Sequence, residues 1–120
     1  MKISDLIEDI IKEMLDIAYE LKKRKANRIF TYATYAIFTN GLELFDKAYS
    51  DGIINGVFGT NLTYLSPELK DREWFNEVDV SKYIAYLIAA INHDVSTSLI
   101  LDPHEKIDSL LKRYNIKWIL

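Results

Sequence analysis

The hydrophobic and polar positions of the first 25 residues predict one amphipathic helix. Apolar side chains recur three and four positions apart, at Leu6, Ile7, Ile10, Ile11, Met14, Leu15, Ala18 and Leu21. The positions between them are mostly charged, with acidic residues leading and basic residues trailing, which suits the helix macrodipole. Ser4 and Asp5 can form the N-cap region, with Ile3 placed for a hydrophobic staple. We expect a helix from about residue 4 to 25, roughly 33 Å long.

Beyond residue 28 the pattern alternates between strands and helices. Residues 29–38 are rich in aromatic and branched side chains, which predicts a strand that is apolar on both sides. A helix then runs from Leu42 to the glycine at 52, and a second apolar strand covers 53–61. A connection with a short helical turn near 68–72 leads to a brief third strand at 77–80.

The last third of the chain is predicted to be helical. Residues 81–92 form a nearly apolar helix that we expect to be buried, and 95–101 is expected to be a loop. Asp102-Pro103 opens a final helix that ends near Tyr114. The alternation indicates an α/β fold with a mainly parallel sheet of three or four strands, helices on both faces, and one domain over residues 1–120.

Composition narrows the function classes. The chain has 120 residues, of which 49% are hydrophobic and 28% charged, as in an ordinary globular domain. It has no cysteine, which excludes disulfides and thiolate metal sites. The 15 basic and 18 acidic residues argue against nucleic-acid binding. The longest apolar run, 83–91, is too short to span a membrane, and no signal peptide is recognisable, so we expect a cytoplasmic protein with no membrane partner.

Few residues suggest chemistry by themselves. His93 and His104 do not have metal-ligand spacing, so a structural or solvated role is expected for both. The basic cluster 22–25 is explained by its place at a helix C-terminus. Two short segments, 39–41 and 96–98, could hold a phosphate, although a cap or a turn is the simpler interpretation of each.

The order of several motifs resembles the C-terminal half of ribose-phosphate pyrophosphokinases (phosphoribosyl pyrophosphate synthetases). The carrying segments are Lys25-Ala26-Asn27-Arg28-Ile29-Phe30, Ala33-Thr34-Tyr35-Ala36-Ile37-Phe38-Thr39-Asn40-Gly41, Gly59-Thr60-Asn61, Ser66-Pro67-Glu68, Asp79 to Ile91 and Ser96-Thr97-Ser98. Many members have A-T-H-G in the second segment, so Tyr35 and Ala36 depart from the pattern. The likeness covers about residues 6 to 114.

This resemblance implies a phosphoribosyltransferase-like domain. Enzymes of the family consist of two such domains, work as oligomers, and transfer a pyrophosphoryl group from ATP to ribose 5-phosphate with magnesium. Mg and ATP or ADP are therefore implied by the resemblance alone, and no cofactor is predicted to bind this chain. The resemblance assigns Ser96 and Ser98 to a regulatory phosphate-binding segment and Glu8 and Asp9 to the acidic pair that binds the sugar.

The segment after Glu8-Asp9 departs from the family. Family members follow the acidic pair with a turn rich in glycine and hydroxyl groups, whose backbone N–H groups bind the sugar phosphate. Here residues 10–13 are Ile-Ile-Lys-Glu, about three residues short and without glycine. Periodicity predicts a continuous helix at this point, and we give it more weight than the family pattern.

The leading hypothesis is a truncated pyrophosphokinase-like protein that has no catalytic residues and no catalysis alone, within the lineage of 5-phosphoribosyl diphosphate formation. It would assemble with itself or with a full-length family member. Two alternatives remain: a subunit or fragment of an active enzyme that needs a partner chain, and a dimeric interaction module held together by the N-terminal helix.

Overall fold

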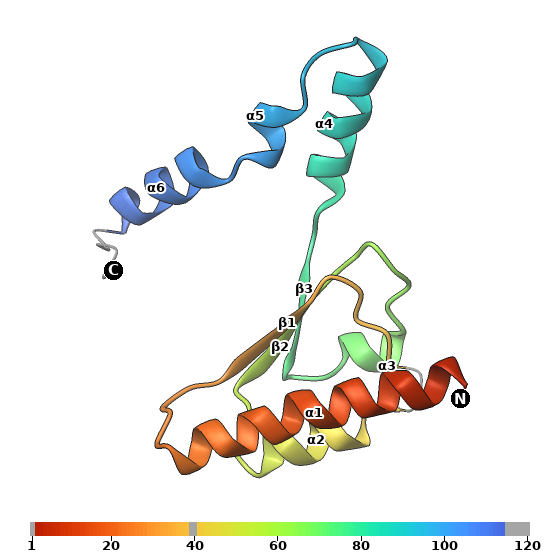
Figure 1. The fold of residues 1–120 in the computed structure, drawn as a ribbon, viewed down its shortest axis with the longest axis vertical. Coiled ribbons are helices and arrows are strands. Elements are labelled where there is room, and N and C mark those ends of the chain that lie inside the picture. Colours follow the sequence, from red (N-terminus) through yellow and green to blue (C-terminus); the bar gives the residue numbers. More distant parts are fainter. Residues whose placement is uncertain (1, 39–40, 115–120) are drawn as a thin grey trace. The chain divides into compact units, whose positions relative to one another are not determined.

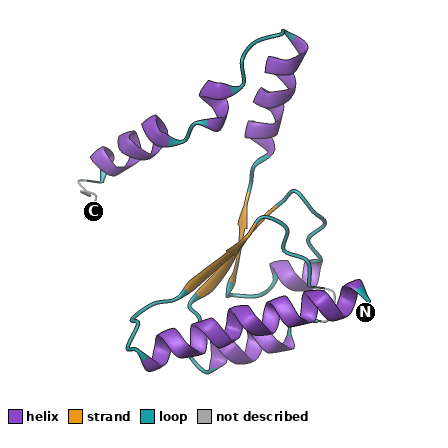
Figure 2. Cartoon of the chain, in the orientation of Figure 1, coloured by secondary structure: helices purple, strands orange, loops and turns teal. Residues whose placement is uncertain are grey.

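The computed structural model describes residues 2–38 and 41–114. Within them the chain is mixed α/β, and it divides into two compact units, residues 1–80 and 81–120, which are described separately (Figures 1 and 2). The elements of the first unit are α1 (Ile3–Lys23), β1 (Phe30–Ala33), α2 (Glu43–Ser50), β2 (Gly56–Thr60), α3 (Pro67–Lys70) and β3 (Phe75–Val78). Those of the second are α4 (Ser81–Asn92), α5 (Ser98–Leu101) and α6 (His104–Arg113).

A small parallel sheet confirms the predicted α/β class for the first unit. Its three strands lie in the order β1-β2-β3, with Phe30 opposite Gly56 and Val57 opposite Phe75. β1 is only four residues long, much shorter than the predicted strand over 29–38. The chain leaves the strand after Ala33 and returns Ala36 to the core, where its Cβ would lie 2.7 Å from a Cβ built on Gly59.

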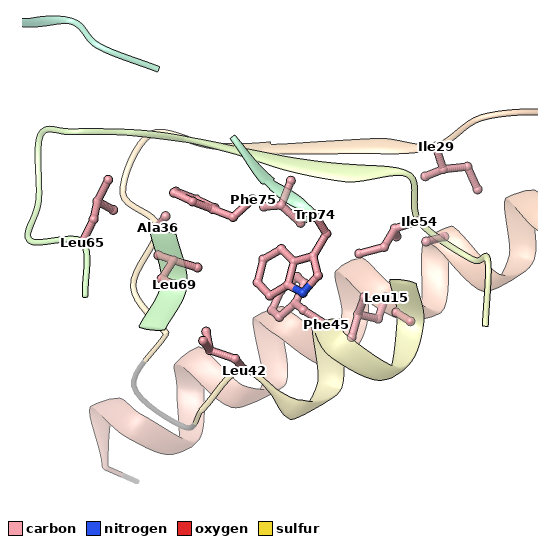
Figure 3. Close-up of a cluster of buried hydrophobic side chains, with 13 residues drawn as sticks. Leu15, Ile29, Ala36, Leu42, Phe45, Ile54, Leu65, Leu69, Trp74 and Phe75 are labelled. Carbon is pink, nitrogen blue, oxygen red and sulfur yellow. The ribbon is translucent and has the colours of Figure 1, made fainter. Parts of the chain in front are cut away.

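The helices of the first unit all cover one face of the sheet (Figures 1 and 3). Because the strand order follows the chain order and parallel crossovers are right-handed, successive crossover helices fall on the same side. This unit therefore forms only one of the two helix layers that the sequence predicts. Its other sheet face carries Phe30, which is exposed. The Phe30 ring is tilted against that of Phe58, with centroids 5.9 Å apart, and lies under the Arg28 guanidinium.

The core of the first unit is an aromatic cluster beneath the sheet (Figure 3). Trp74 is 2% exposed and stacks on Phe45 of α2, with ring centroids 5.4 Å apart. Phe38 and Phe75 approach the indole at 5.8 and 6.3 Å. Aromatic rings bury large apolar areas, so this cluster supplies much of the hydrophobic stabilisation of the unit.

One carboxylate satisfies the polar end of that cluster. Trp74 Nε1–H donates to Asp46 Oδ1 at 2.7 Å, and Arg72 Nε donates to the same oxygen at 2.9 Å. The indole hydrogen bond, followed by that of Arg72, lowers the pKa of Asp46 from its ordinary value. These contacts tie α2 to the segment that enters β3.

The N-terminal helix confirms the prediction from periodicity. α1 runs without a break from Ile3 to Lys23, and its inner side buries Leu15 and Ala18. The N-cap is Lys2, two residues before the predicted Ser4. Asp5 lies in the first turn, where its carboxylate accepts a hydrogen bond from the Lys2 backbone N–H. At the other end, Lys22 Nζ donates to the carbonyls of residues 26 and 27, which lie past the last helical residue, so this lysine holds the turn that follows α1.

The second unit is helical, with two differences from prediction. Within the described residues, Ala90 is the only buried side chain of α4, so the expectation that this helix is buried is wrong. The predicted loop 95–101 contains the short helix α5, which packs against α4. Lys106 of α6 lies 4.8 Å from the ring of Tyr83 on α4. In neither unit is any described helix long and apolar enough to cross a bilayer.

We expect Asp46→Ala to lower the free energy of unfolding at pH 7 by about 1 kcal/mol, because it leaves the Trp74 indole N–H without an acceptor. The expected loss is modest because the Asp46 carboxylate is partly exposed and screened by solvent. Urea unfolding followed by tryptophan fluorescence measures this change. Because the pKa of Asp46 is lowered on folding, the contribution is present above pH 3.8 and is lost as the pH falls below that value. Glu73→Ala, at an exposed neighbouring position, should leave stability unchanged. An equal loss in both variants would contradict the assignment.

Candidate functional site

The first unit contains an apolar pocket between α1 and the β1 strand with its following loop. Its volume is about 220 Å³. The lining residues are Ile7, Ile10, Ile11, Met14, Thr31, Tyr32, Ala33, Tyr35, Ala36, Ile37, Phe38, Phe45 and Val57. Most of these side chains are hydrocarbon, so the pocket is largely apolar.

Two patterns of the sequence place these side chains together. The three-and-four spacing of α1 turns Ile7, Ile11 and Met14 toward the sheet. On β1, alternate residues face the helices, which brings Thr31 into the wall beside Val57, its register partner on β2. The pocket is thus a gap in the same layer that forms the aromatic core.

Thr31 is the unusual residue of this pocket. Its Oγ1 is buried and has no hydrogen-bond partner in the structure of the described residues. A buried hydroxyl without a partner costs about 1–3 kcal/mol, and native proteins contain few of them. Thr31 is not among the candidate residues that the sequence indicates. Its only signal in the sequence is a hydroxyl within a predicted strand that is mostly apolar.

A second, shallower pocket lies past the carboxyl ends of β1 and β2. It has a volume of about 300 Å³ and is lined by Ala36, Ile37, Phe38, Thr63, Tyr64, Ser66 and Leu69. Ligands of open α/β sheets commonly bind at this edge. The Ser66 hydroxyl is already engaged, since it accepts a hydrogen bond from the Leu69 backbone N–H as the N-cap of α3. Of the candidate segment 39–41, residues 39 and 40 lie outside the described part of the chain.

Glu8 and Asp9, the predicted remnant of a sugar-binding pair, lie on the second turn of α1. Lys12 Nζ contacts Glu8 Oε1 at 2.8 Å, and this hydrogen bond raises the pKa of Lys12. Asp9 is exposed to solvent. Neither residue lines the two pockets described above. The helix therefore holds the pair on its outer surface, one of them in an ordinary i,i+4 ion pair.

Ser96 and Ser98, the predicted regulatory phosphate segment, are exposed in the second unit. Their hydroxyls lie 2.9 Å apart, and Ser98 N–H donates to Ser96 Oγ at 3.3 Å. Thr97 is the N-cap of the four-residue helix α5. The arrangement is a hydroxyl turn that begins a short helix, which is the simpler of the two interpretations of this segment.

The histidines are not gathered into a metal site. Among the residues that the structure describes, no group of three or more His, Asp or Glu side chains could hold a metal ion. His104 Nδ1 lies 2.6 Å from Asp102 Oδ1, and the same oxygen accepts from the His104 backbone N–H at 3.0 Å. The predicted cap is shifted by one residue, since α6 begins at His104 and Pro103, not Asp102, is at the N-cap position. The Asp102 carboxylate still accepts a hydrogen bond from the backbone N–H of the first helical residue, His104.

We expect the pKa of His104 to lie above its ordinary value of 6.5, because its ring hydrogen-bonds the Asp102 carboxylate. The stabilisation that this pair gives the start of α6 is present below pH 6.5 and is lost as the pH rises through the raised pKa. NMR titration of the imidazole resonances should show the midpoint falling in Asp102→Asn, whereas Asp94→Asn should not move it. An unchanged midpoint in Asp102→Asn would disprove the contact.

Comparison of the chain with models of protein families and with curated protein sequences finds no match.

Proposed function

We propose that this chain is a non-catalytic relative of ribose-phosphate pyrophosphokinases. The observation that carries the absence of catalysis is the unbroken course of α1 through residues 10–13. Backbone N–H groups in the interior of a helix donate to carbonyls four residues earlier, so they cannot surround a phosphate dianion. The exposed Glu13 carboxylate adds a negative charge to the same segment.

The positions of the resembling segments support the proposed lineage. Ala33-Thr34 ends β1 and Gly59-Thr60-Asn61 ends β2, so both fall on the edge of a parallel sheet where phosphoribosyl substrates would be handled. The two strand ends are joined, because the Thr60 hydroxyl donates to the carbonyl of Thr34. Asn61 donates to Asp79 at 2.8 Å and its side-chain oxygen accepts from Val80 N–H, which ties the end of β2 to the chain after β3.

We expect isothermal titration calorimetry to detect no saturable binding of ribose 5-phosphate, or of ADP with magnesium, to the full chain. The physical reason is the missing phosphate loop, together with the pairing of Glu8 with Lys12 and the exposed position of Asp9 on the helix. A ¹H–¹⁵N NMR titration with the same compounds should leave residues 8–13 unshifted.

Magnesium-dependent binding that shifts residues 8–13 and is abolished by Glu8→Gln with Asp9→Asn would overturn this proposal. That result would favour the alternative in which the chain is a subunit of an active enzyme. As a matched control, Glu68→Gln with Asp71→Asn removes two exposed acidic charges from a different part of the first unit.

A second candidate function, self-association through α1, is favoured by a separate observation. Besides its buried side, α1 carries an exposed apolar stripe at Ile3, Leu6, Ile10, Ile17 and Leu21. Ile3, Ile10 and Ile17 are seven residues apart, as in the seam of a coiled coil, and are 79%, 56% and 63% exposed. Such a stripe on a folded domain is typical of a protein–protein contact.

We expect sedimentation velocity to show a dimer that Ile17→Lys converts to a monomer, since a charge in the centre of the stripe would have to be desolvated. Ile17 is mostly exposed, so the variant should retain the helical circular dichroism of the wild type. Asp16→Lys, one position away on the polar side of the helix, is the matched control and should remain dimeric. A wild-type chain that sediments as a monomer at every concentration would exclude this function.

A further inference from the structure

The C-terminal helix α6 leaves an apolar side uncovered. Ile107, Leu110 and Tyr114 recur three and four positions apart along the helix and its C-cap, and all three are exposed. Among its described residues, α6 has no buried side chain. A helix of about ten residues is marginal in water unless an apolar side packs against another surface. The length and the pattern of α6 therefore indicate that a further surface covers it.

Positive charges lie along one edge of this apolar side. Lys106 lies four residues before Leu110, and Arg113 lies three residues after it. At 3.6 residues per turn, these offsets place both side chains on the same edge, about 40° and 60° around the helix from Leu110. Both are exposed, and Lys106 remains so although its ammonium group lies over the Tyr83 ring. The apolar side of α6 is thus bordered by two cations.

The apolar stripe of α1 carries negative charges at the same two offsets. Glu13 lies four residues before Ile17, and Glu20 lies three residues after it. Both are exposed, and Glu20 also contacts basic side chains at the end of its own helix. The opposite edge of the stripe is bounded by the half-buried Ile7 and Met14. The stripe therefore has one open edge, and this edge is acidic.

Two helices with charges at matching offsets complement each other when they pack antiparallel. In an antiparallel pair equivalent edges meet, and a residue before the centre of one helix lies beside a residue after the centre of the other. With the two central apolar residues opposite each other, Glu13 meets Arg113. Glu20 meets Lys106 in the same arrangement. The charges of each helix are about 10.5 Å apart along its axis, so both contacts form together.

We propose that α6 of a second copy of the chain packs antiparallel on the apolar stripe of α1. The assignment rests on the proposed self-association through α1 and names the segment that meets this helix. Antiparallel pairing of α1 with a second α1 about Ile17 would instead set Glu13 against Glu20, and opposed like charges destabilise a contact. Exchange of α6 between two chains gives two identical contacts related by a twofold axis, which closes the dimer.

Charge reversal on each helix tests this contact, with the dissociation constant of the dimer measured by sedimentation velocity over a concentration series. Lys106→Glu with Arg113→Glu should weaken the dimer about tenfold to a hundredfold, because four exposed ion pairs are lost in the two contacts. Glu13→Lys with Glu20→Lys should weaken it by a similar factor. All four changes together should return the constant to within about threefold of wild type, because the charges are then exchanged between the helices.

Lys82→Glu with Lys112→Glu is the matched control. Both lysines are exposed in the second unit, and the variant has the same net charge as the reversal on α6. Lys112 lies on the opposite side of α6 from Leu110, so the dissociation constant should not change. Recovery in the variant with four changes also excludes a mere loss of the Lys106 contact with Tyr83, which no change on α1 replaces.

Introduced thiols report directly which helices meet, since the chain has no cysteine of its own. An equal mixture of Ile17→Cys and Leu110→Cys chains, one lengthened by a tag, is oxidised and separated on a non-reducing gel. A disulfide-linked heterodimer is expected, because facing positions of two packed helices lie within disulfide reach. Neither variant alone should cross-link.

Two results would contradict the role of α6 and leave self-association through α1 in place. One is a dimer that Ile17→Lys abolishes but that the charges of α6 do not affect. The other is cross-linking of the Ile17→Cys chain with itself, which would pair α1 with α1. A wild-type chain that is monomeric at every concentration would exclude the self-association together with this contact.

Discussion

The burial of Trp74 is the constraint on which the first unit depends. Its indole lies beneath a sheet of only three short strands, among Phe38, Phe45 and Phe75, and is 2% exposed. A tryptophan can be buried this completely only when its N–H finds an acceptor, and Asp46 on α2 provides one. The same carboxylate holds Arg72, so one side chain connects α2 with the approach to β3. A sheet of four- and five-residue strands is thereby held in place by the layer below it.

The course of α1 decides how the polar groups of the first 23 residues are presented. In a helix, backbone donors are used internally and side chains project outward, so the acidic residues of α1 act as ordinary surface groups, as the Glu8–Lys12 ion pair shows. Only some of the apolar side chains of α1 are covered by the rest of the first unit. Leu15 and Ala18 are buried, whereas Ile10 and Ile17 are mostly exposed. These two features are the observations from which the absence of catalysis and the self-association through α1 are proposed.

The pocket beside Thr31 arises from the same packing. The pocket lies between α1 and β1. The chain leaves β1 after Ala33, and Ala36 and Phe38 of the loop that follows complete the lining. Cores are normally filled to the density of organic crystals, and an apolar gap of this size departs from that norm.

Local sequence was sufficient for the features that depend on short-range physics. The spacing of apolar residues determined α1, and the β-rich runs and their alternation with helices determined the parallel α/β class. The short helical turn predicted near 68–72 is present as α3, one residue or two earlier in the chain. Tertiary packing alone decided that β1 ends at Ala33, that all helices of the first unit share one face, and that α4 buries little more than Ala90. It also decided that Thr31 Oγ1 is buried without a hydrogen-bond partner among the described residues. Periodicity reports which side of an element is apolar, but the neighbours that cover that side, and the gaps they leave, are set by segments 20 or more residues away in the chain, as with Thr31 and Val57.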